Sequence, residues 1–169
     1  KNNYLKMQIN IENINDIENI SDLFKDIGLG HGGNPYVSGE LQVCDILKKV
    51  DKNNLIIFDV GANKGNYSKM ISDNLNQNKT IHLFEPAKST FNYLKNNLDS
   101  NEKTNFVYNN IGIGEIKETK TLYYDKDASG KASVYKRKLD HFNIYFNKNE
   151  LINIDSISNY CKNNNIDEI

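Results

Sequence analysis

The 169-residue sequence lacks an excess of charge of either sign, and it lacks long apolar runs. Its 21 basic and 22 acidic side chains nearly cancel, and neither kind forms a long block, which argues against a nucleic-acid or anionic-membrane surface. The longest apolar run, 55–58 with Val60 beyond Asp59, is far shorter than the ~20 residues that cross a bilayer. The polar N-terminus does not resemble a secretory signal. We therefore expect no nucleic acid and no membrane as partners, and a small or neutral ligand.

Cysteine is scarce as well. Cys44 and Cys161 lie far apart, and neither has a Cys or His nearby at metal-ligand spacing. This pattern favours reduced core thiols in a cytoplasmic protein, and it gives no reason to expect a metal. The length and the 38% hydrophobic content fit one compact domain.

The first fifty residues are expected to form an N-terminal helical segment. Apolar residues recur at helical spacing over 13–27, and Gly28 and Gly30 supply a C-terminal stop. After a glycine-rich turn, Ser38 is positioned to cap a second helix that ends before residue 51. One face of this second helix is expected to carry Val43, Ile46, Leu47 and Val50.

From residue 51 onward the pattern predicts an α/β fold. Residues 55–60 are apolar except for Asp59, as in a strand of a parallel sheet that is buried on both faces. Strands are expected next at 81–84 and 105–109, and an amphipathic helical stretch precedes each of them. This alternation is typical of a Rossmann-like, doubly wound parallel sheet. The apolar residues of the first helix are Tyr67, Met70, Ile71 and Leu75, and the second helix carries Phe91, Leu94 and Leu98 on one stripe.

Beyond residue 119 the pattern changes. Segments 120–124 and 132–135 flank a polar loop that contains Gly130, which predicts an antiparallel β-ribbon or an insertion. The sheet is therefore expected to be incomplete in its C-terminal half, with a β-ribbon insertion.

The remaining residues predict one strand, one helix and the start of another strand. The strand is expected at 151–154, and Asp155 is positioned to cap the helix that follows. Residues 166–169 are typical of the beginning of a further strand. The helix is expected to face inward with Ile157, Tyr160 and Cys161.

A glycine-containing turn follows the first strand and reads Asp-Val-Gly-Ala-Asn-Lys-Gly over 59–65. In an open parallel sheet, ligands bind beyond the carboxyl ends of the strands. Gly61 and Gly65 allow positive φ angles and close approach of a ligand, while the amides that open the next helix can face polar groups. Glu85 ends the second strand, where such folds place the acid that accepts hydrogen bonds from ribose hydroxyls. Together these residues predict a nucleoside-containing cofactor.

Two cofactors compete for this pattern. The dinucleotide fingerprint requires Gly-X-Gly-X-X-Gly, whose close glycines let a pyrophosphate approach the helix N-terminus. Position 63 is Asn instead. A cofactor without phosphate but with a zwitterionic amino-acid tail suits the turn better, since Asp59 can face its ammonium group and backbone amides its carboxylate. These residues favour S-adenosylmethionine over NAD.

The sequence resembles the FkbM-type methyltransferases, a class I S-adenosylmethionine-dependent family. The matching segments are 57–65 (Ile-Phe-Asp-Val-Gly-Ala-Asn-Lys-Gly), 83–86 (Leu-Phe-Glu-Pro), 109–114 (Asn-Asn-Ile-Gly-Ile-Gly) and 154–155 (Ile-Asp). The resemblance covers residues 55 to 169, so that 51–169 is interpreted as the N-terminal part of a methyltransferase domain. It implies transfer of a methyl group to an oxygen of a sugar or another small molecule.

The resemblance also implies a set of cofactor contacts and a missing element. Asn110 and Ile111, at the end of the third strand, are similar in place to residues that flank the adenine. The family continues past residue 169 into a strand that helps to form the active site. The implied cofactor-binding residues are Asp59, Gly61, Ala62, Asn63, Gly65, Tyr67, Glu85, Pro86, Asn110 and Ile111.

That further strand would lie against the open edge of the first strand. Without it, the apolar stretch 55–60 is an unprotected edge, which favours aggregation. We expect either a longer natural protein or a partner chain, such as a second copy in a homo-oligomer, to cover this edge.

No general base stands out in the sequence. His82 has the pattern of a packed strand residue, His31 lies in a glycine-rich turn, and His141 has aromatic neighbours that favour no particular role. Tyr36 or Glu40 can touch the methionine end of the cofactor, or both can belong to a hinge turn.

Two groups of side chains have both a ligand interpretation and a structural one. The first can stack against a sugar or pack across strands, and the second can meet an anionic acceptor or form a solvated face. The two groups are Tyr123, Tyr124 and Tyr135, and Lys131, Lys136, Arg137 and Lys138.

Two other functions stay open. An NAD-dependent oxidoreductase is disfavoured by Asn63. A non-catalytic Rossmann-like binding module is disfavoured because a scaffold has no need of Glu85 together with the glycine-containing turn.

Overall fold

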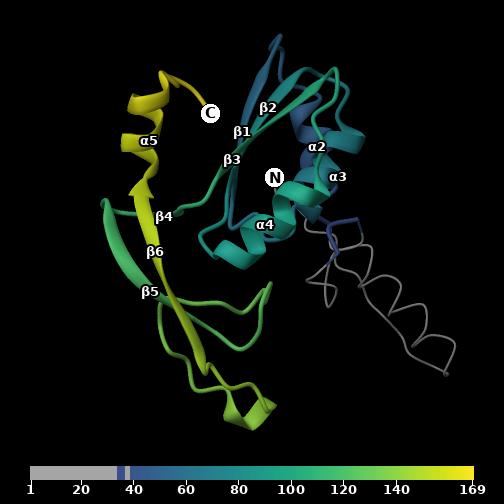
Figure 1. Ribbon diagram of the computed structural model, residues 1–169. Coiled ribbons are helices and arrows are strands. Elements are labelled where there is room, and N and C mark those ends of the chain that lie inside the picture. The colour runs from purple at the N-terminus through teal and green to yellow at the C-terminus, as the bar shows by residue number, and fades with distance from the viewer. Residues whose placement is uncertain (1–33, 37–38) are drawn as a thin grey trace, which may run out of the picture. The chain divides into compact units, whose positions relative to one another are not determined.

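The computed structural model describes residues 34–36 and 39–169 (Figure 1). The chain divides into two compact units, Lys1–Gln42 and Val43–Ile169, and the sheets described below belong to the second unit. The helix predicted over 13–27, the turn residue His31 and the predicted cap Ser38 lie outside the described residues.

The predicted second helix is shorter than expected. Helix α2 spans Gln42–Leu47 and ends before Val50. Its buried residue is Cys44, whose Sγ lies 3.7 Å from Sδ of Met70. Ile46, predicted to lie on the apolar face of this helix, is 64% exposed, so the buried face of α2 is a different one. The cause is geometric, since a residue two positions after Cys44 lies about 200° around the helix from it.

A parallel sheet follows, with helices between its strands (Figure 1). Its strand order is β1-β2-β3, with both pairings parallel. This confirms the predicted α/β fold with an incomplete Rossmann-like sheet, and the helices and strands lie where the apolar pattern placed them. The elements are β1 (Leu55–Val60), α3 (Asn66–Asn74), β2 (Lys79–Phe84), α4 (Lys88–Asn97) and β3 (Thr104–Asn109).

Helices lie on both faces of this sheet. Figure 1 shows α3 and α4 on one side, where Met70 and Leu94 are fully buried. On the opposite side lies α5 (Ile157–Asn164). Its Tyr160 ring meets Phe58 and Phe84 edge-on, with ring centroids 5.6 and 4.8 Å apart. The second face of the sheet is therefore covered by α5, which comes much later in the chain than β3.

Burial on both faces was predicted for β1, but β2 is the strand that shows it. Residues 81–84 of β2 are all buried. In β1, Ile56, Ile57 and Phe58 are half-buried and Val60 is 52% exposed. The prediction for β1 is wrong because β1 lies at the edge of the sheet, with β2 as its paired neighbour among the described residues.

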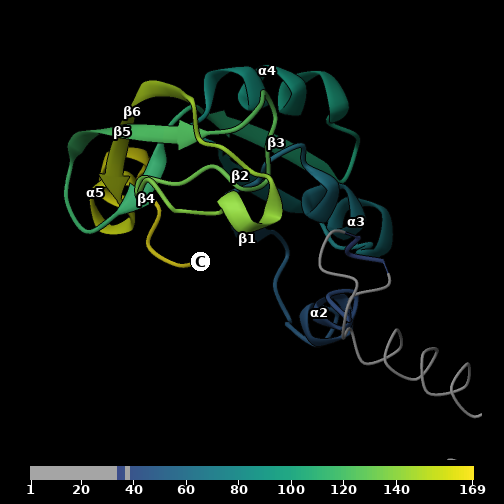
Figure 2. The same ribbon diagram turned by 90° about the horizontal axis from the view of Figure 1, so that it is seen from below.

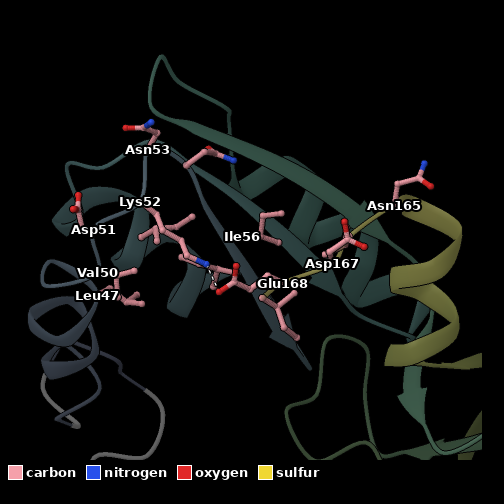
Figure 3. A pocket seen from close by; sticks show the side chains of 14 residues that line it. Leu47, Val50, Asp51, Lys52, Asn53, Ile56, Asn165, Asp167 and Glu168 are labelled. Carbon is pink, nitrogen blue, oxygen red and sulfur yellow. Dashed lines mark ion pairs between the residues drawn. The ribbon is translucent and has the colours of Figure 1, made fainter.

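The open edge of β1 borders a pocket of about 660 Å³, whose other wall is residues 165–169 (Figure 3). Lys52 and Glu168 form an ion pair there. The predicted strand over 166–169 is wrong, since these residues have no regular secondary structure. A strand needs a hydrogen-bonded neighbour, and none of the described strands pairs with this segment. The covering of the edge by a second copy of the chain stays a prediction.

A second, smaller sheet contains β4 (Gly112–Gly114), β5 (Glu118–Tyr124) and β6 (Lys148–Ser156) in the order β4-β6-β5. The predicted ribbon between 120–124 and 132–135 is reduced to one bridge, Tyr123 with Ser133. Instead, the whole length of β5 pairs with β6 in an antiparallel arrangement. The reason is packing, because this pairing buries Leu122, Ile152 and Ile154 in one cluster with Ala87.

The cap of α5 lies one residue later than predicted. Ser156 is the N-cap, and its Oγ accepts a hydrogen bond from the Asn159 amide at 3.1 Å. The predicted cap, Asp155, accepts instead from the Asn159 side chain and from the Ser156 amide. Tyr160 faces inward as expected, whereas Ile157 is 37% exposed.

Candidate functional site

The ends of β1 and β2 are joined by the carboxylate of Glu85. Its Oε2 accepts a hydrogen bond from the amide of Asn63 at 3.0 Å, and its Oε1 accepts one from the amide of Ala87 at 2.9 Å. The side chain is 7% exposed. Two segments predicted to act together, the turn over 61–65 and the end of β2, are therefore in direct contact.

The turn after β1 is held by main-chain hydrogen bonds to β2. The amides of Gly61 and Ala62 both donate to the carbonyl of Phe84, at 2.9 and 3.0 Å. Gly61, Asn63 and Gly65 all have positive φ angles, of 83°, 50° and 85°. A conformation of this kind favours Gly and Asn, which explains the composition of the turn.

The two glycines of the turn have different reasons to be glycine. A Cβ on Gly61 would meet no atom within 4 Å, so the space beside it is open to a ligand. A Cβ on Gly65 would lie 2.7 Å from Leu98 and 2.8 Å from Leu94. Glycine is thus required at position 65 because Leu94 and Leu98 pack closely against it. The sequence had predicted glycine there for the approach of a ligand.

The carboxylate of Asp59 is oriented by helix α3, which follows β1. Asp59 is 8% exposed, and its Oδ2 accepts a hydrogen bond of 2.6 Å from Oγ of Ser68 in α3. Ser68, which is 1% exposed, was missed by sequence reasoning. A polar residue beside the inward apolar positions of α3 was the available signal.

The site is electrically negative. Burial raises the pKa of Glu85 above its ordinary value, and the negative charges of Glu150 and Asp59 add to the rise. The hydrogen bonds from Ala87 and Asn63 oppose it, because they stabilise the ionised carboxylate. Such a cluster suits hydrogen-bond donors and cationic groups of a ligand, and it opposes anionic ones.

The remaining predicted cofactor residues lie around Glu85 and the turn. Nδ2 of Asn110 donates to the main-chain carbonyls of Glu85 and Pro86, at 2.8 and 3.1 Å, so this side chain joins the end of β3 to the loop after β2. Ala62 is buried, and Tyr67, in the first turn of α3, is half-buried. Ile111, the residue immediately before β4, is also half-buried.

The second sheet and its loop also reach this region, which sequence reasoning missed. A Cβ on Gly130 would lie 3.4 Å from Nδ2 of Asn63. Glu150, in β6, accepts a hydrogen bond from the Lys88 amide at 3.3 Å, at the start of α4. No local signal could have identified Gly130 or Glu150, because their positions depend on the pairing of β5 with β6.

The two histidines that the structure describes both have contacts away from Glu85. His82 is buried in β2, as predicted for a packed residue, and its Nδ1 lies 2.8 Å from the Tyr160 hydroxyl. His141 is exposed, and its ring lies 4.2 Å from that of Phe142. Tyr36 and Glu40 belong to the first unit of the chain. Within 34–36 and 39–169, no group of three or more His, Cys, Asp or Glu side chains has the arrangement of a metal site.

The aromatic and basic groups lie on the chain between and beside β5 and β6. Tyr123 and Tyr124 are half-buried in β5, whereas Tyr135 is 76% exposed. The four basic residues are all exposed, and three of them line one pocket: Lys136, Arg137 and Lys138.

No protein-family model matches this chain, and no curated protein is significantly similar to it. Within the part of the chain that the structure describes, no helix is both long enough and apolar enough to cross a membrane.

Proposed function

We propose that this chain is the cofactor-binding part of an FkbM-type methyltransferase that uses S-adenosylmethionine and methylates a hydroxyl group of a sugar or another small molecule. The observation that supports the proposal best is the hydrogen bond between Glu85 and the amide of Asn63. It brings an acid at the end of β2 into contact with the turn that follows β1, which is the place where doubly wound folds bind nucleosides.

Glu85 retains the capacity to bind a ribose. An ionised carboxylate offers about four lone-pair directions. The amides of Asn63 and Ala87 use one on each oxygen, which leaves capacity for the two ribose hydroxyls. The open space beside Gly61 would admit the cofactor next to the main chain.

The charge of the site favours S-adenosylmethionine over NAD. A pyrophosphate needs amides and positive charge at the turn. Here the Asn63 amide already donates to Glu85, and the charges of Asp59 and Glu150 act on the same carboxylate. A sulfonium and an ammonium group are positively charged and suit this surrounding, with Asp59 facing the ammonium.

When bound, S-adenosylmethionine supplies an electrophilic methyl group, so the protein has to orient the acceptor oxygen and exclude water. The turn over 61–65, Asp59 and Glu85 would hold the cofactor, and Asn110 would keep the loop after β2 in place for the adenine. We place the enzyme in the cytoplasm, because Cys44 and Cys161 are free thiols.

The test is calorimetric titration of the 169-residue chain with S-adenosylmethionine and, separately, with NAD. We expect S-adenosylmethionine to bind, and Glu85→Ala to weaken binding by about tenfold or more, because two charge-assisted hydrogen bonds are lost. Glu85→Gln, which keeps one acceptor oxygen, should have a smaller effect. The matched control is Glu102→Ala, since Glu102 is exposed in the loop before β3.

Thermal unfolding of each variant separates lost binding from lost folding, because Glu85 also joins two main-chain segments. Binding of NAD in place of S-adenosylmethionine would favour the oxidoreductase. Tight S-adenosylmethionine binding that is unchanged in folded Glu85→Ala would overturn the role of Glu85. Absence of binding by either cofactor to the folded chain would favour a non-catalytic module.

A further inference from the structure

The connection between β5 and β6 forms a pocket of about 480 Å³. Three successive cations, Lys136, Arg137 and Lys138, line it together with the rings of Tyr145 and Phe146. Among the described residues of the lining, Asp140 is the one acidic side chain, so the pocket has an excess of positive charge. This distinguishes it from the negative region around Glu85.

Arg137 is held in place within this pocket. Its guanidinium group lies over the ring of Phe146, 5.6 Å from the ring centroid, and its Nη2 donates to the carbonyl of Lys131. Phe146, which also lines the pocket, is 6% exposed. A guanidinium fixed over an aromatic ring loses less freedom when it binds a ligand than a solvated side chain does.

The identity of this cation is informative as well. Arg137 is the single arginine of the chain, among 20 lysines. The planar guanidinium can bind carboxylate or phosphate through two parallel hydrogen bonds, which an ammonium group cannot do.

The chain segment that forms the pocket lies at the same end of the parallel sheet as the candidate cofactor site, namely where the strands terminate. In Figures 1 and 2, the connection between β5 and β6 lies beyond the carboxyl ends of β1, β2 and β3. Two contacts link the sites along the chain. Gly130 lies against the side chain of Asn63, and the next residue, Lys131, accepts the hydrogen bond from Arg137.

We infer that this pocket binds a sugar that carries an anionic group, a phosphate or a carboxylate. The three cations pair with the anionic group, and the face of Tyr145, which is 56% exposed, packs against the ring. The inference that this sugar is the methyl acceptor rests on the proposed function, whereas binding of the sugar does not. Positive charge here and negative charge at Glu85 would separate an anionic acceptor from a cationic cofactor.

The experiment is calorimetric titration of the 169-residue chain with glucose 6-phosphate, glucuronate and, as a neutral reference, glucose. We expect at least one anionic sugar to bind about tenfold more tightly than glucose, and the stronger of the two to identify the anionic group. Arg137→Gln should reduce that affinity by about tenfold.

Arg137 also contacts Lys131, so a second variant guards against a local change of the loop. Lys136→Gln/Lys138→Gln alters two exposed side chains and should weaken binding of the anionic sugar without altering thermal unfolding. The matched control, Lys117→Gln/Lys162→Gln, removes the same charge from exposed positions in the β4–β5 loop and in α5 and should leave binding unchanged.

Three results would overturn the inference: no binding of either anionic sugar up to about 10 mM, equal binding of glucose, or an equal loss in the control variant. Titration of the same proteins with S-adenosylmethionine separates this inference from the proposed function. If the sugar binds in a way that depends on Arg137 but S-adenosylmethionine does not bind, the sugar-binding pocket is supported and the proposed methyltransferase function is rejected. The reverse result would reject the pocket alone.

Discussion

Nδ1 of His82 lies 2.8 Å from the hydroxyl oxygen of Tyr160, and this contact joins the middle strand of the parallel sheet to α5. The Tyr160 hydroxyl also lies 3.1 Å from Oδ1 of Asn109, to which it donates. Nδ2 of Asn109 in turn donates to main-chain carbonyls of β2 and β3. Since the hydroxyl has one proton, His82 Nδ1–H is the donor to Tyr160, which assigns the tautomer of the ring. His82 Nδ1, the Tyr160 hydroxyl and the Asn109 amide thus form one continuous hydrogen-bond network.

Removal of the Tyr160 hydroxyl should destabilise the second unit. In Tyr160→Phe, the Nδ1–H of His82 and Oδ1 of Asn109 lose their partner inside the protein, which costs about 1–3 kcal/mol of unfolding free energy. Urea unfolding followed by circular dichroism measures the loss. Tyr93→Phe is the matched control, because Tyr93 is 53% exposed and its variant should lose little. Equal stability of the two variants would contradict the network.

The stability of the protein should fall in mild acid because of His82. Burial lowers the pKa of His82, so the folded state resists a proton that the unfolded chain accepts below about 6.5. The stabilising contribution is therefore complete above that pH, and it is lost progressively as the pH falls from there through the lower folded pKa. Urea unfolding at pH 7.5 and 5.5 measures the change.

Two variants test whether His82 is the cause. His82→Gln should be less stable than wild type at pH 7.5 and should lose less stability between the two pH values. His141→Gln should follow wild type at both, because His141 is exposed. Glu85 acts in the opposite sense, since its raised pKa favours the folded state as the pH falls toward the carboxyl range. An unchanged pH dependence in His82→Gln would exclude the assignment.

The two glycines of the turn should differ when replaced by alanine. Both have positive φ angles, so each variant carries backbone strain of about 1–2 kcal/mol. Gly65→Ala also forces Leu94 and Leu98 to move, which adds the cost of an overpacked core, about 1–3 kcal/mol. We expect Gly65→Ala to be clearly the less stable in urea unfolding. Gly61→Ala should stay folded and bind S-adenosylmethionine more weakly, and equal stability of the two variants would contradict the packing role of Gly65.

The parallel sheet could be predicted from the sequence because its signals are local. The apolar run of β1 ends in a glycine-containing turn, and the helices on either side of β2 repeat apolar residues at helical spacing. Glu85 and Asn63 were placed together by the same reasoning, since parallel strands end at one edge of the sheet.

The second sheet could not be predicted in the same way. Segments 120–124 and 132–135 have the pattern of a hairpin, yet β5 pairs with β6 because that pairing buries Leu122 against Ile152. Pairings over long separations in sequence leave no local pattern. The positions of Glu150, Gly130 and the pocket around Arg137 all depend on this pairing, so the structure was needed to find them.

Glu150 should control the pH at which Glu85 becomes protonated. Its negative charge helps to raise the pKa of Glu85, after the larger effect of burial. Glu150→Gln removes that charge and keeps an oxygen that can accept from the Lys88 amide. The pKa of Glu85 should therefore be lower in the variant, which carbon NMR titration of the Glu85 carboxyl group measures in the protein without ligand.

The same change should shift the pH dependence of cofactor binding. Ribose hydroxyls donate to an ionised carboxylate, so binding of S-adenosylmethionine should weaken as the pH falls through the pKa of Glu85, and the midpoint should lie at lower pH in Glu150→Gln. Glu118→Gln is the control, because Glu118 lies at the start of β5 and pairs with Lys120. An NMR shift of the Glu85 pKa without a shift in binding would mean that Glu85 does not contact the cofactor. No shift of the pKa would mean that Glu150 does not act on Glu85, whatever the cofactor is.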